Sequence, residues 1–507
     1  MTNVSVVAAA VLALTPFATY SQVQEHHHDT PTENLGTVHF ANSCDPKVAP
    51  QFDRAVALLH SFEFGASIRA FNDVLATDST CAMAYWGIAL SRWTNPVAVG
   101  NRPVALLQQG RKAAAVATRL GDHATDRERG YISAVSQLYD DYEHRNQPTR
   151  VLAYERAMND LTLRQPADTE AKIFHAISLV AAASPTDKTY ANQLKAGSIL
   201  EALWTKEPNH PGIAHYIIHT YDYPPLAGKA RAAAARYATI APSAAHALHM
   251  PSHTFTRVGM WQESVDANTR SMKVALSTNS IAEALHAADY EMYAYMQMGK
   301  DSEARAIVDQ LPALAARFDP SAITGAAPGS AGAFALAAIP ARWVLERGAW
   351  SEAAALVPKA TDYPYADAMT YFARALGASH TGDLDDARPA IDSLGSIQQR
   401  LISKGEAYLA EQVAIQQLEA RAWLELADKN ENDALAHLRE AAAREDATEK
   451  SAFSPGPLKP AREQLGDMLT QLHRSVEAKA EYEAVLKKEP NRRHSLRALG
   501  RSVAQIN

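Results

Sequence analysis

A period of 34 residues runs through most of this 507-residue chain and limits the folds it can adopt. Pro208 and Pro242 lie one period apart, and histidines recur at the same step. This period is typical of a helix–turn–helix unit that packs only against its neighbours. Glycines mark expected turns between helices, and these are Gly259, Gly299, Gly348 and Gly382. The sequence therefore predicts an all-α fold, a right-handed α-solenoid of antiparallel helix pairs of the tetratricopeptide type.

The phase of the repeat divides the chain into six predicted segments. About six extra residues between Ser277 and Ala284 stretch one step to 40 residues, and Ser451 to Lys459 contains turn-forming residues and predicts a loop. The segments are a signal peptide over 1–21, a disordered polar segment over 22–42, N-terminal repeats over 43–165, central repeats with a His-rich groove over 166–318, degenerate helical repeats over 319–450, and a C-terminal repeat and cap over 451–507.

Composition excludes some partners and indicates export. A net charge of -7 and a pI near 6.3 provide no basic surface for nucleic acid or anionic membranes. The apolar run from Val4 to Leu14 resembles a signal peptide with cleavage near Ser21 or Gln22, although no Lys or Arg precedes it. We expect a periplasmic or secreted protein without integral membrane association, because no other stretch is long and apolar enough to span a membrane.

The chain contains two cysteines, Cys44 and Cys81. In an oxidising compartment, such a pair favours a disulfide, here between the segment before the first repeat and the start of the second. Two buried thiols are the alternative.

The most informative motif is a pair of histidine pairs one period apart. Within each pair the spacing is i,i+4, which places both imidazoles on one helical face. Stacking the repeats brings the four rings together, and these are His215, His219, His249 and His253. Aligning repeats that start at Pro211, Ala245 and Leu285 adds further groove-lining side chains, and these are His246, His286, Asp222, Asp289, Tyr293 and Arg257.

This residue set predicts a transition-metal site. Imidazole is a common ligand of zinc, copper and iron, and a carboxylate often completes the set. Four histidines would close the site, whereas three nitrogens and Asp289 would leave a position open for water or substrate. Asp289 or Tyr293 would assist proton transfer, and Asp222 would accept a hydrogen bond from a ring N–H. Arg257 and Arg342 would pair with a substrate carboxylate.

Pro251 lies between His249 and His253 and complicates this prediction. Inside a helix it would kink it, and at a first helical turn it would leave His249 before the helix. Either arrangement lets the second pair differ from the first.

Three functions fit the sequence. The first is a metalloprotein, with metal-dependent hydrolysis or oxidation as the reaction, acting on a small molecule or peptide in the concave groove. The second is a peptide-binding scaffold, a frequent use of such repeats. The third is metal storage or delivery. A zincin peptidase is disfavoured because Tyr216 stands where the HExxH motif has its glutamate.

Several phrases resemble a bacterial group of exported tetratricopeptide-repeat proteins of undefined function. They run from about Leu35 to Asn491 and include VALLHSFEF, HPGIAHYIIHTYD, APSAAHALHMPSHTFTRVGMW and EDATEKSAFSPGPLKPARE. The resemblance implies an α-solenoid and carries over no catalytic residue.

Overall fold

The computed structural model describes Met1 and residues 33–506, and side chains up to residue 502. The predicted signal peptide and residues 22–32 of the predicted disordered segment lie outside the described residues. Asn34–Asn507 form one compact unit. The described residues contain helices and no strand.

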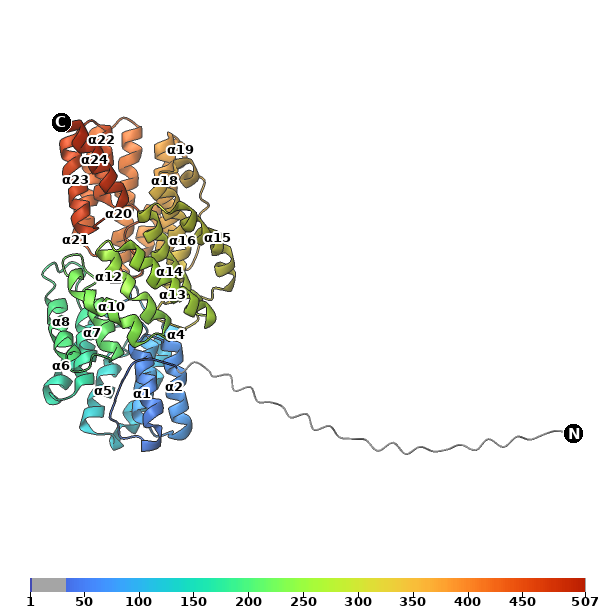
Figure 1. Cartoon of the computed structure of the whole chain (residues 1–507), viewed down its shortest axis with the longest axis vertical. Helices are drawn as coiled ribbons and strands as arrows, with labels where there is room; N and C mark the ends of the chain where they lie inside the picture. The colour runs from blue at the N-terminus through green and yellow to red at the C-terminus, as the bar shows by residue number, and fades with distance from the viewer. Residues whose placement is uncertain (2–32, 507) are drawn as a thin grey trace. The chain divides into compact units, whose positions relative to one another are not determined.

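Helices follow one another with short connections, as Figure 1 shows. The first twelve are α1 (Ala49–His60), α2 (Phe64–Thr77), α3 (Ala82–Trp93), α4 (Val104–Leu120), α5 (Asp126–Gln137), α6 (Gln147–Arg164), α7 (Thr169–Ala181), α8 (Ala191–Trp204), α9 (Pro211–Thr220), α10 (Arg231–Ile240), α11 (Ala245–His249) and α12 (Pro251–Arg257). The remaining helices are α13 (Trp261–Ser277), α14 (Ile281–Met298), α15 (Asp301–Arg317), α16 (Gly329–Arg347), α17 (Trp350–Ala354), α18 (Pro364–Thr381), α19 (Leu384–Ser403), α20 (Ala407–Ala427), α21 (Glu431–Ala447), α22 (Ala461–Gln471), α23 (Ser475–Lys488) and α24 (Arg493–Ile506). Three short 3-10 helices accompany them, and these are Pro46–Val48, Gly121–His123 and Ala227–Ala230.

The prolines and glycines that mark the repeat lie in turns between helices, as the sequence predicts. Pro208 and Pro242 lie in the turns before α9 and α11. The glycines that separate α12 from α13, α14 from α15, α16 from α17 and α18 from α19 have φ of +69°, +72°, +64° and +79°. A residue without a side chain adopts this left-handed conformation without strain and ends a helix. Consecutive helices pack on each other, α3 on α4 and α13 on α14 for example. The predicted all-α class is confirmed; the right-handed superhelical twist stays a prediction.

The apolar core consists of two large clusters. One contains side chains between Leu35 and Met250, together with Ala326, and the other contains side chains between Ile281 and Ala498. Helices α9, α11, α12 and α14 lie where the first cluster gives way to the second. This junction positions the candidate site.

Residues 34–42 correct one expectation, since they fall in the segment predicted to be disordered. They lack regular secondary structure but pack against the helices, and Phe40 is 3% exposed. The ring of Phe40 contacts those of Phe52, Trp86 and Tyr131, and its amide donates to Asp53 Oδ1 at 2.9 Å. Burial of apolar side chains among the polar residues of this segment offsets the entropy of ordering it.

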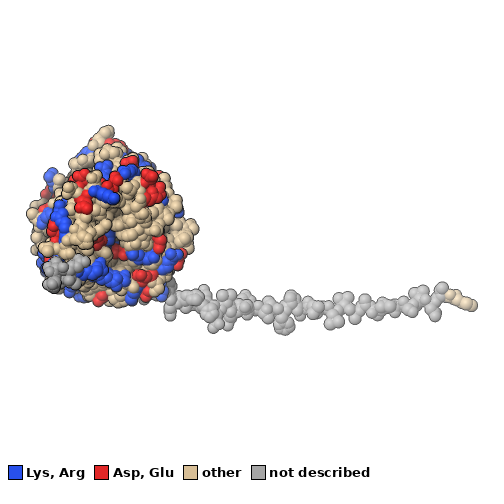
Figure 2. Space-filling model, turned by 90° about the horizontal axis from the view of Figure 1, so that it is seen from above, with Lys and Arg blue, Asp and Glu red and all other residues tan. Residues whose placement is uncertain are grey.

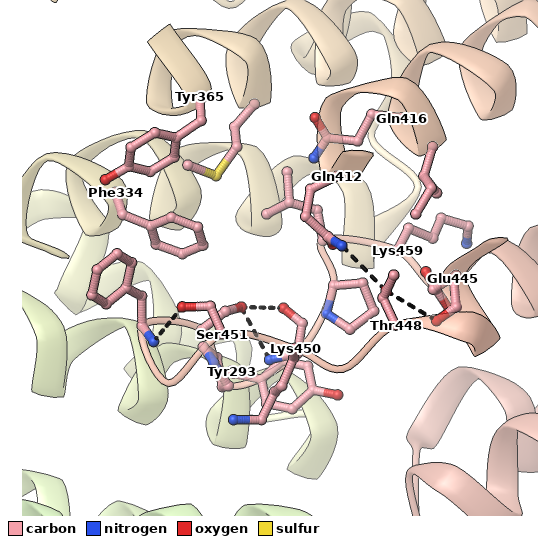
Figure 3. A pocket seen from close by; sticks show the side chains of 18 of the residues that line it. Tyr293, Phe334, Tyr365, Gln412, Gln416, Glu445, Thr448, Lys450, Ser451 and Lys459 are labelled. Atoms are coloured by element: carbon pink, nitrogen blue, oxygen red, sulfur yellow. Dashed lines mark hydrogen bonds between the residues drawn. The ribbon is translucent and has the colours of Figure 1, made fainter. Parts of the chain in front are cut away.

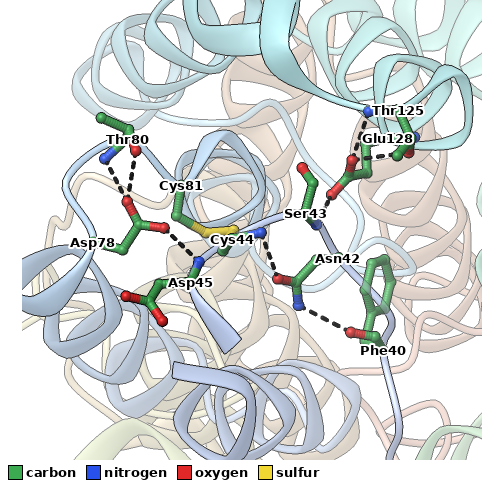
Figure 4. Close-up of a disulfide and its surroundings, with 10 residues drawn as sticks. All are labelled: Phe40, Asn42, Ser43, Cys44, Asp45, Asp78, Thr80, Cys81, Thr125 and Glu128. Atoms are coloured by element: carbon green, nitrogen blue, oxygen red, sulfur yellow. Dashed lines mark hydrogen bonds between the residues drawn. A yellow bond between two sulfur atoms is a disulfide. The ribbon is translucent and has the colours of Figure 1, made fainter. Parts of the chain in front are cut away.

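The predicted disulfide is present. Cys44 and Cys81 are bonded, with Cα atoms 4.9 Å apart, and Figure 4 shows the surrounding hydrogen bonds. The Asp45 amide donates to Asp78 Oδ2 at 2.9 Å, on the same side of the bond. The disulfide therefore joins the segment before α1 to the residue that precedes α3.

The surface carries both charge signs. On the face seen in Figure 2, Lys and Arg lie among Asp and Glu. Among the described helices, none is long and apolar enough to cross a membrane.

Candidate metal centre

Six buried histidines from four helices form two groups of three. In each group, one ring nitrogen per histidine lies within 4.8 Å of the others. None of the six residues is more than 5% exposed. We call His215, His219 and His246 the first triad, and His249, His253 and His286 the second triad. Helix α9 carries the first pair, α11 carries His246 and His249, α12 carries His253 and α14 carries His286.

This grouping changes the predicted four-histidine site. The pairs His215/His219 and His249/His253 stay together, but each takes its third member from the next repeat. The fifth and ninth positions of one repeat thus meet the second position of the following repeat. The structure brings together two adjacent three-histidine sites, because ring centroids of His219 and His253 lie 5.9 Å apart.

Pro251 divides the second pair between two short helices. Helix α11 ends at His249, and Pro251 occupies the first turn of α12. The intervening Met250 keeps helical dihedral angles. Since His249 Nε2 and His253 Nε2 lie 3.0 Å apart, the break redirects the chain without separating the rings.

The first triad presents nitrogen atoms that have no partner. His215 Nδ1 donates to the His60 carbonyl oxygen at 2.6 Å, and His246 Nδ1 donates to Glu283 Oε1 at 2.9 Å. Donation from Nδ1 leaves the lone pair on Nε2. Within the described part of the chain, Nε2 of His215, His219 and His246 is buried and makes no hydrogen bond.

In the second triad, the Nε2 atoms of His249 and His253 lie close together. His249 Nδ1 donates to Asn268 Oδ1 at 2.6 Å, and His253 Nδ1 donates to Asp222 Oδ2 at 2.9 Å. Asn268 Nδ2 donates to the Ser264 carbonyl, which fixes the amide orientation. In the neutral rings, both Nε2 lone pairs therefore face each other across 3.0 Å.

Burial keeps five of the six rings neutral. It lowers the pKa of His215, His219 and His249 well below the usual value, and the neighbouring imidazoles add to the effect. The pKa of His286 falls to about 3, again chiefly through burial. Burial also lowers the pKa of His253, although Asp222 opposes the shift. Neutral imidazole is the form that binds a metal.

A carboxylate supports the second triad from behind. Asp222 accepts from His253 Nδ1, from Arg257 Nε at 2.8 Å and from Lys450 Nζ at 3.3 Å. Burial acts in the opposite direction, yet Lys450, Arg257 and His253 hold the pKa of Asp222 well below its usual range. Asp222 thus occupies the place where the sequence predicts an acceptor. Arg257, expected to bind a substrate carboxylate, is paired with Asp222 instead.

An aromatic ring covers each triad. Phe62, which follows α1, lies 4.4 Å from His215, 5.6 Å from His219 and 5.7 Å from His246 between ring centroids. Phe62 has a φ of +56°, an uncommon conformation for a bulky residue that indicates a constrained position. Tyr290 has the matching place in the second triad, 5.0 Å from His249, 4.8 Å from His253 and 5.3 Å from His286.

A small cavity lies between the triads. Its volume of about 10 Å³ accommodates about one water-sized molecule. Two histidines of each triad line it, and these are His219, His246, His253 and His286. The other lining residues are Asn95, Ala326, Ala327, Pro328, Ala331, Ala452 and Phe453.

Residues 448–460, which we call the strap, lie over this region. Lys450 reaches Asp222, while Ala452 and Phe453 line the cavity. Tyr290 OH lies within hydrogen-bonding distance of the carbonyl oxygens of Ala452 and Ser454, at 3.2 and 3.0 Å. The strap was predicted only as a loop. The structure shows that it fills the groove beside the histidines.

Asp289 and Tyr293, which the sequence predicts as catalytic residues, bond to groups outside the triads. Asp289 Oδ1 accepts from Arg342 Nε at 3.2 Å, and Tyr293 OH donates to Glu489 Oε2 at 2.9 Å. Arg342 also donates to the Pro457 carbonyl of the strap at 3.1 Å. These residues match the paired positions of the triads, but one repeat further along the solenoid. They therefore lie beyond the second triad and anchor the strap.

Sequence reasoning missed several contacts of the triads. Phe62, Asn268 and Lys450 come from segments without the His periodicity, and Glu283 lies on α14 before the repeat that starts at Leu285, so tertiary structure reveals these contacts. Tyr290 had a usable signal, because it lies four residues after His286 on α14 and shares its face.

A third polar cluster adjoins the first triad. Glu170 accepts from His60 Nε2 at 2.8 Å and from His210 Nε2 at 3.0 Å. Tyr216 OH lies 3.1 Å from His60 Nδ1. Glu170 satisfies both Nε2 atoms, whereas His210 Nδ1 is buried and makes no hydrogen bond in the described residues. The cluster orients His60, whose carbonyl fixes His215.

A larger pocket lies on the other side of the strap. Its volume is about 120 Å³, and Figure 3 shows Phe334 and Tyr365 facing strap residues Lys450 and Ser451. Phe453 lines both this pocket and the small cavity between the triads. One side chain thus separates the histidines from a space with aromatic walls.

Comparisons with known proteins add little. No protein family model and no curated protein matches the chain. Among solved structures, human IFIT1 bound to m7Gppp-AAAA is similar with 11% identity and a TM-score of 0.38, over 92% of this chain and 96% of that one. Yeast Tom70 gives 13% identity and a TM-score of 0.39, over 91% and 96%. The APC/C hetero-tetramer Cut9-Hcn1 gives 12% identity and a TM-score of 0.36, over 90% and 76%. Similarity this distant indicates no function.

Proposed function

We propose that this protein binds two transition-metal ions, one in each histidine triad. The observation that carries the proposal is the 3.0 Å separation of His249 Nε2 and His253 Nε2. Both rings use their Nδ1 proton elsewhere, so two lone pairs face each other. A cation between them converts this repulsion into attraction. Metal–imidazole bonds of about 2.0–2.1 Å place two nitrogen ligands about 3 Å apart when they meet near a right angle.

The first triad supports the same proposal independently. Its three Nε2 atoms are buried without a hydrogen-bond partner in the described residues. Leaving one buried polar atom unsatisfied costs about 1–3 kcal/mol, so three in one place need a compensating ligand. Support of the Nδ1 atoms by Glu283 and the His60 carbonyl matches the usual second layer of a metal site.

Three nitrogens per metal leave a coordination position open, as in catalytic rather than structural sites. Zinc, copper and iron all accept imidazole. The enzymatic form of the proposal is metal-dependent oxidation or hydrolysis, with the pocket beyond Phe453 admitting the organic substrate. Storage or delivery would use the same ligands without turnover. A peptide-binding groove is less favoured because the strap fills the groove at this point.

Export remains part of the proposal. The apolar N-terminal run, the resemblance to exported repeat proteins and the Cys44–Cys81 disulfide all favour a periplasmic or secreted protein.

Metal analysis of the purified chain tests the proposal. After metal loading and removal of excess ions, we expect two ions per chain in the wild type and one in either His219→Gln or His253→Gln. His175→Gln is the matched control, because His175 is equally buried but bonded to Glu155 outside the triads. Absence of stoichiometric metal from replete protein would contradict the proposal. Thermal unfolding with and without metal separates loss of a site from loss of the fold.

A further inference from the structure

We propose that the two ions are copper and that the cavity between the triads binds dioxygen. This inference rests on the proposed function and specifies its chemistry. It follows from three features of the centre, which are the ligand type, the local charge and the size of the cavity.

The six groups that offer ligand atoms are all imidazoles. No carboxylate belongs to either triad. Asp222 and Glu283 instead accept hydrogen bonds from Nδ1 of His253 and of His246, respectively. Close pairs of doubly charged ions in hydrolytic centres repel each other strongly, and anionic ligands normally reduce that repulsion. Two neutral sets of three nitrogens suit Cu(I), which accepts three-coordinate geometry and imidazole ligands.

The local charge supports the singly charged ion. Around the second triad, Asp222 is already balanced by Arg257 and Lys450. The second triad therefore offers little negative charge for a further cation, and beside the first triad Glu283 supplies a single negative charge. At equal distance, two Cu(I) ions repel each other with about a quarter of the energy of two doubly charged ions.

The cavity adjoins both triads and has room for one small molecule. It is lined by two histidines from each triad, and Ala327, Ala331 and Phe453 supply small or apolar walls. Its volume of about 10 Å³ excludes an organic substrate. Dioxygen entering this space lies beside both metal positions.

The electrons balance within the site. Each Cu(I) gives one electron and becomes Cu(II), and dioxygen accepts both electrons, so its double bond becomes a single bond. No proton and no further reductant are needed. The total charge of the two ions and the bound molecule stays the same, because the electrons move only from the metals to dioxygen. A buried centre avoids any new net charge in this way.

Loading with Cu(I) without oxygen, followed by addition of dioxygen, tests the inference. We first expect two copper ions per chain, which verifies the proposed function. Dioxygen should then be taken up at one molecule per two copper ions. X-ray absorption should show Cu(II), and the paramagnetic resonance signal should be absent because the bridging molecule couples the two ions.

Two outcomes overturn the inference and leave the proposed function standing. One is two bound copper ions without dioxygen uptake, and the other is the resonance signal of isolated Cu(II). Fewer than two copper ions per chain also overturns the inference, whereas fewer than two ions after loading with zinc, copper and iron in turn contradicts the proposed function itself.

A cavity-filling variant provides a second test. Ala331→Val adds two methyl groups to a wall residue that offers no metal ligand. We expect two copper ions and at least a tenfold weaker uptake of dioxygen. Ala335→Val is the matched control, because Ala335 is equally buried on α16 but does not line the cavity. Equal uptake by both variants would contradict the assigned position.

Discussion

The two triads are built from the same repeat positions, yet their surroundings differ. An apolar ring, Phe62, covers the first triad, whereas a phenol, Tyr290, covers the second. The first triad has three nitrogens without partners, and the second has two nitrogens held 3.0 Å apart. In the described part of the chain, hydrogen bonds connect the strap to the second triad, through Asp222 and Tyr290, and the first triad meets the strap across the cavity.

The difference shows that a repeat can supply two equivalent sets of ligands while their surroundings differ. Periodicity places the ligands, because residues 34 apart in sequence take equivalent positions in successive repeats. The rings that cover them do not follow the period, since Phe62 lies between α1 and α2 and Tyr290 lies on α14. We therefore expect the first triad to be an apolar, protected site and the second to respond to charge and to movement of the strap.

The largest expected difference in stability comes from replacing the two carboxylates that accept hydrogen bonds from triad histidines, Asp222 and Glu283. Asp222→Asn should lower metal affinity of the second triad by about 10–100-fold, because His253 loses its anionic acceptor. It should also lower the free energy of unfolding by about 3–5 kcal/mol, since buried Arg257 and Lys450 lose their counter-charge. Calorimetry with metal and chemical unfolding of the metal-free protein measure the two effects.

Glu283→Gln is the matched variant for the first triad. Glu283 accepts from His246 and from the Ala327 amide. We expect a similar loss of metal affinity but a smaller loss of stability, about 1–3 kcal/mol, because no Lys or Arg forms an ion pair with Glu283 in the described chain. Equal destabilisation by the two variants would remove the electrostatic distinction between the triads.

The sequence predicts part of this comparison and misses the rest for physical reasons. Periodicity identifies the helices, the glycine turns and both His pairs, because these depend on local spacing. It places Asp289 and Tyr293 in the site, since they match the pair positions of the next repeat. Each pair meets the following repeat, so those two residues lie one step too far. Tertiary contacts from α1 and the strap leave no periodic signal.

A titration near the second triad has the next largest expected effect. Burial and Arg257 lower the pKa of Lys450 to about 8, while Asp222 and Glu449 oppose that shift. Between pH 8 and about 9.5, the unfolded chain holds a proton on this lysine that the folded chain releases. The free energy of unfolding of the metal-free protein should therefore rise with pH, by up to about 1.4 kcal/mol per unit.

Lys450→Met tests the origin of this rise. The variant should lack the increase, because the neutral side chain does not titrate. Tyr290, which also faces Lys450, has a pKa raised well above the usual value by burial and stays neutral in this range. A rise of the same size in Lys450→Met would assign the effect to other groups and leave the second triad no more charge-sensitive than the first.

The smallest expected effect comes from the two covering rings. Tyr290→Phe removes the hydroxyl that lies 3.2 and 3.0 Å from the carbonyl oxygens of Ala452 and Ser454, and makes the second cover resemble the first. We expect a loss of about 0.5–1.5 kcal/mol and faster hydrogen exchange in residues 448–460. Phe62→Leu, by contrast, should leave exchange in the strap unchanged, because the contacts of Phe62 are with the first triad and with Phe64 and Tyr216. If both variants loosen the strap equally, the two halves of the centre are mechanically linked, and the strap belongs to the first triad as much as to the second.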